Sequence, residues 1–194
     1  MHWQALPHSM GPGVIVPKME KNLYLTGLMG AGKTAVGKLL ASNLGIDLYD
    51  TDEIIAATEG MSINEIFSSR GESFFRDKET EILQLLGEKS PGICVVSTGG
   101  GAVVRDENRA AMRKNGLIVF LEVTAEEALK RLSISGDRPL LNVQDREKSL
   151  KHLLQKRDPC YREADVAVQT TGKPVEEIVK VIIRAVKEWR ENEQ

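Results

Sequence analysis

The stretch GLMGAGKT at residues 27–34 decides the fold of this chain. It matches the phosphate-binding pattern G-x-x-x-x-G-K-[ST] at every fixed position. The apolar run Leu23–Leu25 precedes it and predicts a buried strand, and a helical pattern of apolar residues follows it as far as Gly45. A strand, a glycine-rich loop and a helix in this order predict a site for a nucleoside triphosphate.

The residues of this loop have separate predicted roles around the phosphates. Glycines allow backbone N–H groups to turn inward, and the new helix directs its positive end at the same anion. We expect Lys33 to contact the β- and γ-phosphates and the Thr34 hydroxyl to ligate Mg²⁺. The residues expected to bind the nucleotide are Gly30, Ala31, Gly32, Lys33, Thr34 and Ala35.

The composition is typical of one globular domain. The chain has 194 residues, of which 41% are hydrophobic, and a formal net charge of −2. This charge, and the lack of a long basic block, argue against nucleic acid or an anionic membrane surface as a partner. We expect a flexible leader at residues 1–21, with Met19 as an alternative start, and a single domain at residues 22–194.

The cysteines and the N-terminal residues indicate the compartment. Cys94 and Cys160 form no C-x-x-C pair, which favours free thiols in a reducing environment. No segment approaches the roughly 20 apolar residues that a membrane span needs. The first residues also lack the charged start and long apolar run of a signal peptide. We therefore expect a cytoplasmic protein.

Strand and helix signals alternate along the chain, which predicts an α/β fold with a largely parallel sheet. The residues from 133 to 142 show turn residues and no clear period, and we expect a mobile loop there. The capping pattern S/T-x-x-E occurs at Ser62 and at Thr124, and Pro174 suits the first turn of the last helix. Further strands are expected at 46–49, 93–96, 117–121 and 166–168, and further helices at 51–59, 62–71, 73–86, 106–114, 124–132 and 145–156.

Two aspartates follow the second expected strand. If the chain stays extended there, Asp50 and Asp52 lie on one face. One carboxylate would then hold Mg²⁺, directly or through water, and the other would accept a proton from a substrate hydroxyl. The competing interpretation of Asp50 is a helix N-cap. An N-cap explains one aspartate better than it explains two.

Glycines and arginines add an acceptor site to this prediction. Thr98 and the glycines 99–101 follow the third expected strand, where a ligand can approach bare backbone closely. Arg76 and Arg157 would clamp an acidic substrate through paired hydrogen bonds. Arg138, in the loop without a period, would close over the phosphates as a lid residue and stabilise the transferring phosphoryl group. Ordinary surface charge explains each arginine as well as these roles do.

Six motifs, in the right order and spacing, resemble the shikimate kinase family. They are GLMGAGKT, YDTD, FFRD, TGGG, RPLL and RDPCYREAD, and the resemblance runs from about Asn22 to Val186. It implies a three-layer P-loop kinase fold with a five-stranded parallel sheet and a mobile lid. It also implies a monomer that transfers the γ-phosphoryl group of ATP to the 3-hydroxyl of shikimate, on the route to chorismate and the aromatic amino acids.

The resemblance also assigns roles to individual residues. Arg76 and Arg157 match the arginines that hold the shikimate carboxylate, and Asp52 matches the residue proposed as the base. Asp50 is similar to the aspartate near Mg²⁺, and Arg138 to the lid arginine that meets the phosphates. Arg131 and Lys173 lie near positions that flank adenine in some members, although a solvated helix face explains Arg131 equally well. The glycines beside the substrate ring correspond to Gly99, Gly100 and Gly101.

Two other functions fit parts of the sequence. A gluconate kinase would also phosphorylate a hydroxylated acid, but the acidic segment with His-Pro expected after its second strand is missing, and the triple glycine favours shikimate. A non-catalytic nucleotide-binding regulator would not need both Lys33 and Asp52. Tight nucleotide binding without turnover of any acid would identify such a regulator.

Overall fold

The sheet has five parallel strands, and the phosphate loop leaves its central one. The computed structural model describes residues 21–89, 93–135 and 146–193. The strand order is β2-β3-β1-β4-β5, and every adjacent pair is parallel. This confirms the expected five-stranded parallel sheet. The strands are β1 (Asn22–Thr26), β2 (Asp47–Asp50), β3 (Cys94–Ser97), β4 (Gly116–Glu122) and β5 (Val166–Gln169).

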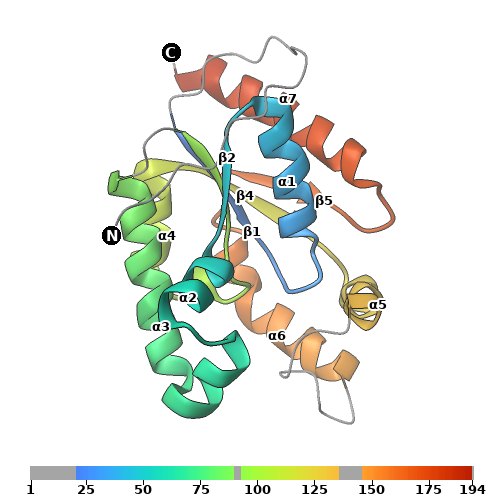
Figure 1. The fold of residues 1–194 in the computed structure, drawn as a ribbon. Helices are drawn as coiled ribbons and strands as arrows, with labels where there is room; N and C mark the ends of the chain where they lie inside the picture. The colour runs from blue at the N-terminus through green and yellow to red at the C-terminus, as the bar shows by residue number, and fades with distance from the viewer. Residues whose placement is uncertain (1–20, 90–92, 136–145, 194) are drawn as a thin grey trace.

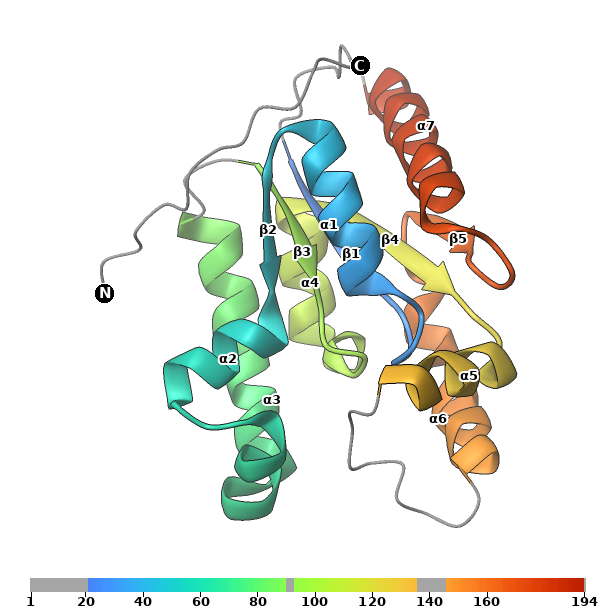
Figure 2. The same ribbon diagram turned by 45° about the vertical axis from the view of Figure 1, so that its right-hand side comes forward.

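Helices cover both faces of this sheet, and three of them gather near the carboxyl ends of its strands. In Figures 1 and 2, α1 and α7 lie on one face, α3 and α4 lie on the other, and α2, α5 and α6 surround the carboxyl ends of the strands. Open α/β sheets bind their ligands at the carboxyl ends of their strands. The helices are α1 (Lys33–Leu44), α2 (Thr51–Glu59), α3 (Ile63–Lys89), α4 (Asp106–Asn115), α5 (Ala125–Ser135), α6 (Arg146–Tyr161) and α7 (Val175–Glu193), with the short 3-10 helix η1 (Ala102–Val104).

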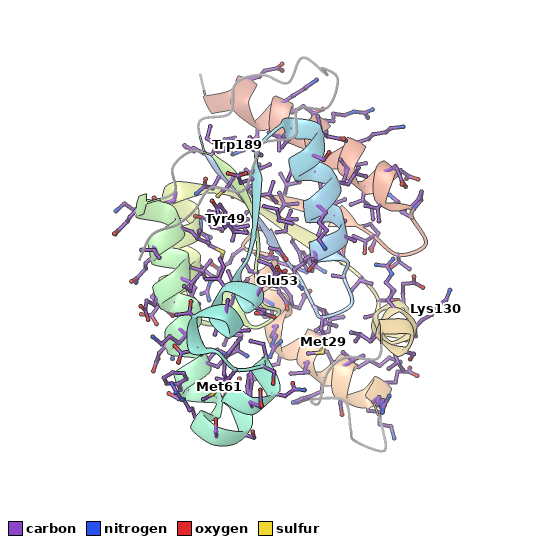
Figure 3. The ribbon with its side chains drawn as sticks, in the orientation of Figure 1. Met29, Tyr49, Glu53, Met61, Lys130 and Trp189 are labelled. Carbon is purple, nitrogen blue, oxygen red and sulfur yellow. The ribbon has the colours of Figure 1, made fainter. Side chains whose placement is uncertain are left out.

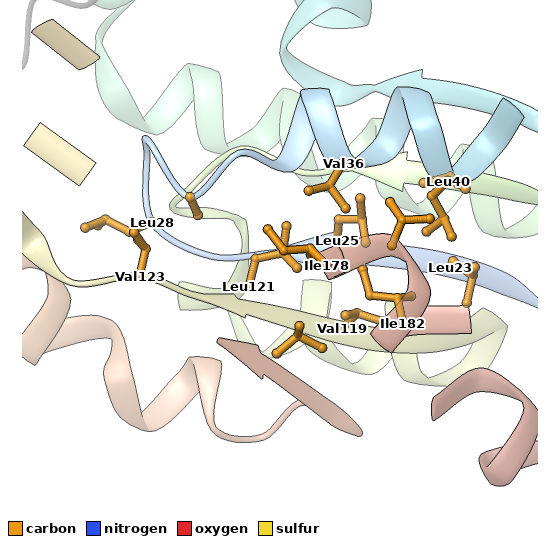
Figure 4. Close-up of a cluster of buried hydrophobic side chains, with 14 of the residues drawn as sticks. Leu23, Leu25, Leu28, Val36, Leu40, Val119, Leu121, Val123, Ile178 and Ile182 are labelled. Atoms are coloured by element: carbon orange, nitrogen blue, oxygen red, sulfur yellow. The ribbon is translucent and has the colours of Figure 1, made fainter. Parts of the chain in front are cut away.

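Alternate side chains of the strands build two separate cores. Leu23 and Leu25 of β1 point to the face covered by α1 and α7, as Figure 4 shows, whereas Tyr24 between them joins the core under α3 and α4. This is the period of two that a strand buried on both faces requires. Leu28 of the phosphate loop belongs to the first core, so the loop begins from a fixed point.

Local signals set most of the helix ends as expected. Gly45 and Gly60 both adopt the left-handed conformation, with φ of 66° and 65°, and end α1 and α2. The capping box at the start of α3 forms in full, because Ser62 and Glu65 exchange hydrogen bonds. The second box is only half formed. The Thr124 hydroxyl accepts from the Glu127 N–H at 3.2 Å, but the Glu127 side chain bonds Arg131 instead.

Three helices differ from the prediction. The segments expected at 62–71 and 73–86 form one element, α3, with a kink at Gly71, where φ is 81°. Helix α5 continues to Ser135, so residues 133–135, which were expected in a loop, are helical. Helix α6 runs past Lys156 to Tyr161 and contains Pro159. The remainder of the expected lid, including Arg138, and nearly all of the expected leader lie outside the described residues.

Among the residues that the structure describes, no helix combines the length and the apolar character that crossing a bilayer demands.

Candidate active site

The phosphate loop is shaped by glycines that no other residue could replace without strain. Gly27, Gly30 and Gly32 have φ of 140°, 79° and 93°. A Cβ atom on Gly30 would lie 2.7 Å from the carbonyl oxygen of Ala128, so the loop packs directly on α5. In Figure 3, Met29 marks the loop, with Glu53 on α2 to one side and Lys130 on α5 to the other.

Lys33 is buried at the start of α1, with its ammonium group inside the loop. Its Nζ donates to the carbonyl oxygens of Gly27 and Leu28 at 2.9 and 3.0 Å. These contacts bring the cation to the concave side of the loop, next to the backbone that would surround a phosphate. The sequence prediction for Lys33 and its loop therefore fits the geometry.

Three oxygen-bearing side chains converge beside Lys33. Asp50 ends β2, and its Oδ2 atom accepts hydrogen bonds from the hydroxyls of Thr34 and Ser97, each at 2.9 Å. Sequence reasoning paired Thr34 with Asp50 but missed Ser97. The sequence feature that could have indicated Ser97 is its position as the last residue of β3, directly before Thr98 and the glycines.

The two aspartates of the YDTD segment are not on one extended face, because α2 begins at Thr51. The premise that the chain stays extended there is wrong. Asp50 is the N-cap of α2, with its Oδ1 accepting from the Asp52 N–H at 3.1 Å. The N-cap role and the contact with Thr34 therefore coexist, since each uses a different oxygen of Asp50. Asp52 lies in the first helical turn.

The triple glycine allows acidic and basic side chains to touch the backbone. A Cβ atom on Gly99 would lie 2.3 Å from Oε1 of Glu79 and 2.8 Å from Oδ1 of Asp52. A Cβ atom on Gly101 would lie 2.5 Å from Nη2 of Arg76. The glycines thus leave room for these three side chains to gather, whereas the predicted contact with a substrate stays a prediction.

Arg76 reaches this group from α3 and is held there by two glutamates. It forms an ion pair with Glu79 one helical turn away and another with Glu72 at 3.1 Å. Its side chain is 13% exposed and that of Glu79 is fully buried, whereas the side chain of Glu72 is 64% exposed. Glu79 therefore orients Arg76 from the protein interior. Sequence reasoning missed Glu79, because its spacing from Arg76 is ordinary for a helix surface pair.

Burial raises the pKa of the Glu79 carboxyl above its ordinary value. Desolvation raises the pKa of its carboxyl above the ordinary value, the Arg76 guanidinium lowers it, and the nearby Asp52 carboxylate raises it again. Among the described residues, Oε1 of Glu79 is buried with no hydrogen-bond partner. A buried carboxylate beside a second acid and two arginines is typical of a site that binds a charged ligand.

Arg157 approaches the same glycines from α6. Its Nη1 donates to the Gly100 carbonyl at 3.0 Å, and the hydroxyl of Tyr161 one turn later donates to the same oxygen. Tyr161 stacks on Phe120 with ring centroids 4.9 Å apart, and burial raises its pKa to about 12. Tyr161, which sequence reasoning also missed, therefore remains a neutral donor that fixes Gly100 beneath Arg157.

The predicted site residues that the structure describes form two groups, one on the phosphate loop and the start of α1 and one around the triple glycine, and the two groups meet where Gly100 lies against the backbone of Gly27 and Met29. Arg138 lies outside the described residues, so its predicted position is not tested. Arg131 is bound to the phosphate loop and to Thr170, and it does not lie on a purely solvated helix face. Lys173 follows Thr170 and pairs with Glu177 at 3.6 Å.

Comparisons with known proteins agree with this arrangement. Residues 29–187 match a family model described as "Shikimate kinase". A shikimate kinase from Thermodesulfovibrio yellowstonii is 46% identical over 84% of this chain and 94% of its own length. A crystal structure of shikimate kinase from Acinetobacter baumannii in complex with shikimate superposes with a TM-score of 0.83, at 37% identity over 88% of this chain and 95% of that one. A gluconokinase from Sinorhizobium meliloti 1021 has a TM-score of 0.61 at 20% identity, with 91% of this chain and 97% of that one covered, and it shares the fold alone.

Proposed function

The chain belongs to the shikimate kinase family, and on that premise we propose that it transfers the γ-phosphoryl group of ATP to the 3-hydroxyl of shikimate. The observation that carries the proposal is the meeting of two half-sites at the carboxyl ends of the strands. The phosphate loop with Lys33 forms one half. Arg76, Arg157 and Asp52, gathered on the triple glycine, form the other.

The acceptor half fits a small acid that carries hydroxyl groups. Arg76 and Arg157 come from different helices and both contact the glycine segment, so a carboxylate between them would receive hydrogen bonds from two sides. Asp52 lies against Gly99 and would accept a hydrogen bond from a hydroxyl. Gly99, Gly100 and Gly101 would border the ring, because a side chain at Gly99 or Gly101 would displace the charged groups and one at Gly100 would press on the backbone of the phosphate loop.

The nucleotide half would hold the polyphosphate against backbone N–H groups. Gly30, Ala31, Gly32, Thr34 and Ala35 provide the loop and the first helical turn, whose positive end favours an anion. On binding, the Lys33 ammonium would exchange its carbonyl contacts for phosphate oxygens. We also retain Arg138 as the lid residue that contacts the γ-phosphate.

Mg²⁺ fits the oxygen donors beside Lys33. The Thr34 hydroxyl and the Asp50 carboxylate are 2.9 Å apart, and Mg²⁺ prefers hydroxyl, carboxylate, phosphate and water oxygens. Within the described ranges, no cluster of three or more His, Cys, Asp or Glu side chains forms, which suits a metal held partly by the nucleotide. When bound, Mg²⁺ would neutralise charge on the phosphates.

The chain's own residues then contribute alignment and charge to the transfer. The 3-hydroxyl oxygen would form a bond to the γ-phosphorus as the bond to the departing ADP oxygen breaks, and Asp52 would take the hydroxyl proton. Arg76 and Arg157 would hold the acceptor in line, and Lys33 would offset the negative charge of the phosphoryl group. The reaction requires no covalent intermediate with the protein.

The first test is ADP release from Mg·ATP with shikimate, with gluconate or without acceptor, at matched concentrations. We expect stimulation by shikimate only. Stimulation by gluconate instead would favour a gluconate kinase and would contradict the acceptor assignment. Tight ATP binding without stimulation by either acid would favour a regulator that does not turn over.

Gly101→Ala should weaken the acceptor half without unfolding the chain. The added Cβ would displace the Arg76 guanidinium, which is the end of a flexible side chain, and the Gly101 φ of −107° accommodates alanine. We expect the KM for shikimate to rise by about tenfold, because one charged hydrogen bond to the substrate is lost, and the KM for ATP to stay unchanged. Equal increases in both KM values would show a general distortion of the site.

Glu79→Gln tests whether the buried glutamate positions Arg76. Glutamine has nearly the same shape but no charge, so the guanidinium loses its interior counter-charge. We expect the KM for shikimate to rise by about tenfold, with a smaller change in the KM for ATP. The matched control is Glu72→Gln, which removes the exposed partner of the same arginine and should change KM by less than about twofold. Equal effects of the two variants would contradict the role of Glu79.

Three further properties belong to this proposal. We propose a cytoplasmic monomer with small-molecule partners only and no nucleic acid or membrane partner, in keeping with the net charge of −2. We also propose that residues 22–194 act as one domain. Light scattering at assay concentrations would test the monomer, since a dimer would double the 21.4 kDa mass.

A further inference from the structure

Arg131 links the phosphate loop to the far edge of the sheet. Its Nη1 atom donates to the carbonyl oxygens of Gly30 and Ala31 at 3.4 and 3.3 Å. On its other side, Nη1 and Nη2 donate to the hydroxyl and the carbonyl of Thr170 at 3.3 and 2.8 Å. Nε donates to Glu127 one turn earlier on α5 at 3.0 Å. One guanidinium thus joins three segments that are distant in sequence.

Thr170 gives this link a rigid anchor. It is fully buried, and both its N–H and its hydroxyl donate to the carbonyl of Glu122 at the end of β4, at 2.8 and 3.0 Å. Arg131 itself is about three-quarters buried and is oriented by Glu127. The loop carbonyls are therefore tied through Arg131 and Thr170 to the end of β4, which lies next to the central strand.

The link also fixes the direction of the loop's amide groups. In a trans peptide the carbonyl and the following N–H point in opposite directions, and the described residues contain no cis peptide. The Ala31 carbonyl points at Arg131, so the Gly32 N–H points to the face of the loop away from α5. The Ala31 N–H is already used within the loop, where it donates to Leu28 at 3.1 Å.

We propose that Arg131 is a positioning residue that holds the phosphate loop in its anion-binding shape before the nucleotide arrives. The proposal rests on the proposed nucleotide site and extends it. It differs from a contact with the adenine base, because it acts on the polyphosphate through the loop backbone. It therefore applies to any ligand that presents a polyphosphate, with or without a base.

Inorganic tripolyphosphate separates the two roles, since it has the phosphates of ATP but no adenine. We would measure the Kd of ATP and of tripolyphosphate by calorimetry for the wild type, Arg131→Met and Lys130→Met. Lys130 is the matched control, because its side chain is 74% exposed and points away from the loop in Figure 3. We expect Arg131→Met to weaken both ligands by a similar factor of about ten, and Lys130→Met to change neither by more than about twofold.

Two further measurements distinguish positioning from charge alone. Arg131→Lys keeps the charge but cannot reach both the loop carbonyls and Thr170, so we expect it to restore only a minor part of the affinity. In the nucleotide-free protein, we expect the Ala31 amide, which donates to Leu28, to exchange hydrogen faster in Arg131→Met, while the amides of β1 stay protected.

Each outcome decides the proposal. Loss of ATP affinity with unchanged tripolyphosphate affinity would assign Arg131 to the base and overturn it. Full restoration of affinity by Arg131→Lys, or unchanged exchange of the Ala31 amide in Arg131→Met, would overturn it as well. If the wild type bound neither ATP nor tripolyphosphate, the proposed nucleotide site itself would be wrong. If the wild type and Arg131→Met bound both ligands equally well, only the positioning role of Arg131 would be wrong.

Discussion

Lys33→Ala should lower kcat by at least about 100-fold, because loss of one preorganised donor to a reacting group costs about 10²–10³ in rate. The Lys33 ammonium is buried within the phosphate loop, where it donates to two of the loop's own carbonyl oxygens. Its contribution should increase as charge shifts onto the departing ADP. We would measure steady-state kcat with shikimate and ATP both saturating.

The control for Lys33→Ala is Lys38→Ala, which removes an exposed lysine from the same helix and should leave kcat unchanged. Thermal unfolding of both variants is needed, because Lys33 also bonds two loop carbonyls in the absence of nucleotide. A kcat within about fivefold of the wild type, in a folded Lys33→Ala protein, would contradict the assignment of the phosphate loop.

Arg157→Ala should raise the KM for shikimate by about 100-fold, since a charge-assisted hydrogen bond to a carboxylate contributes roughly 2–3 kcal/mol. Arg157 is buried, so solvent would not compensate for the lost guanidinium. We expect the KM for ATP to change by less than about threefold, because Arg157 is on the acceptor side of the glycine segment. Steady-state kinetics with each substrate varied in turn would measure both values.

Two controls isolate the carboxylate contact of Arg157. Arg162→Ala removes a 58% exposed arginine from the segment that follows α6, and we expect no change in either KM. A shikimate analogue with a hydroxymethyl group in place of the carboxylate should be used equally well by wild type and Arg157→Ala. If Arg157→Ala raised the KM for this analogue as much as it raised the KM for shikimate, the cause would be a displaced Gly100 rather than a lost carboxylate contact.

The sequence alone predicted the parts of this fold that depend on neighbouring residues. The phosphate loop, the helix at 51–59 and the buried strands all follow from glycine positions, caps and apolar periods that operate within a few residues. The same reasoning ended α6 near Lys156, before Pro159, which lacks the N–H that a helix interior needs. The helix nevertheless continues, and Arg157 and Tyr161 reach the same carbonyl from consecutive turns.

The candidate site was predictable to the extent that its residues follow the strands. Asp50, Asp52 and the glycines 99–101 directly follow β2 and β3, so the fold places them together. Glu79, Ser97 and Tyr161 matter because of partners 20 to 61 residues away, which are Gly99 for Glu79, Asp50 for Ser97 and Gly100 for Tyr161. No local pattern contains that information. Arg76 and Arg157 could be separated from surface charge only by the resemblance or by the structure.

The division of the sheet into two cores has a consequence for how this enzyme can change over generations. The phosphate loop begins in the core shared with α1 and α7, whereas Phe75 and Tyr161, which lie beside the acceptor arginines, belong to the opposite core. Mutations that reshape the acceptor side therefore alter packing that the phosphate loop does not share. New acceptor preferences can therefore accumulate by small steps on one face of the sheet, while the residues that bind ATP stay unchanged.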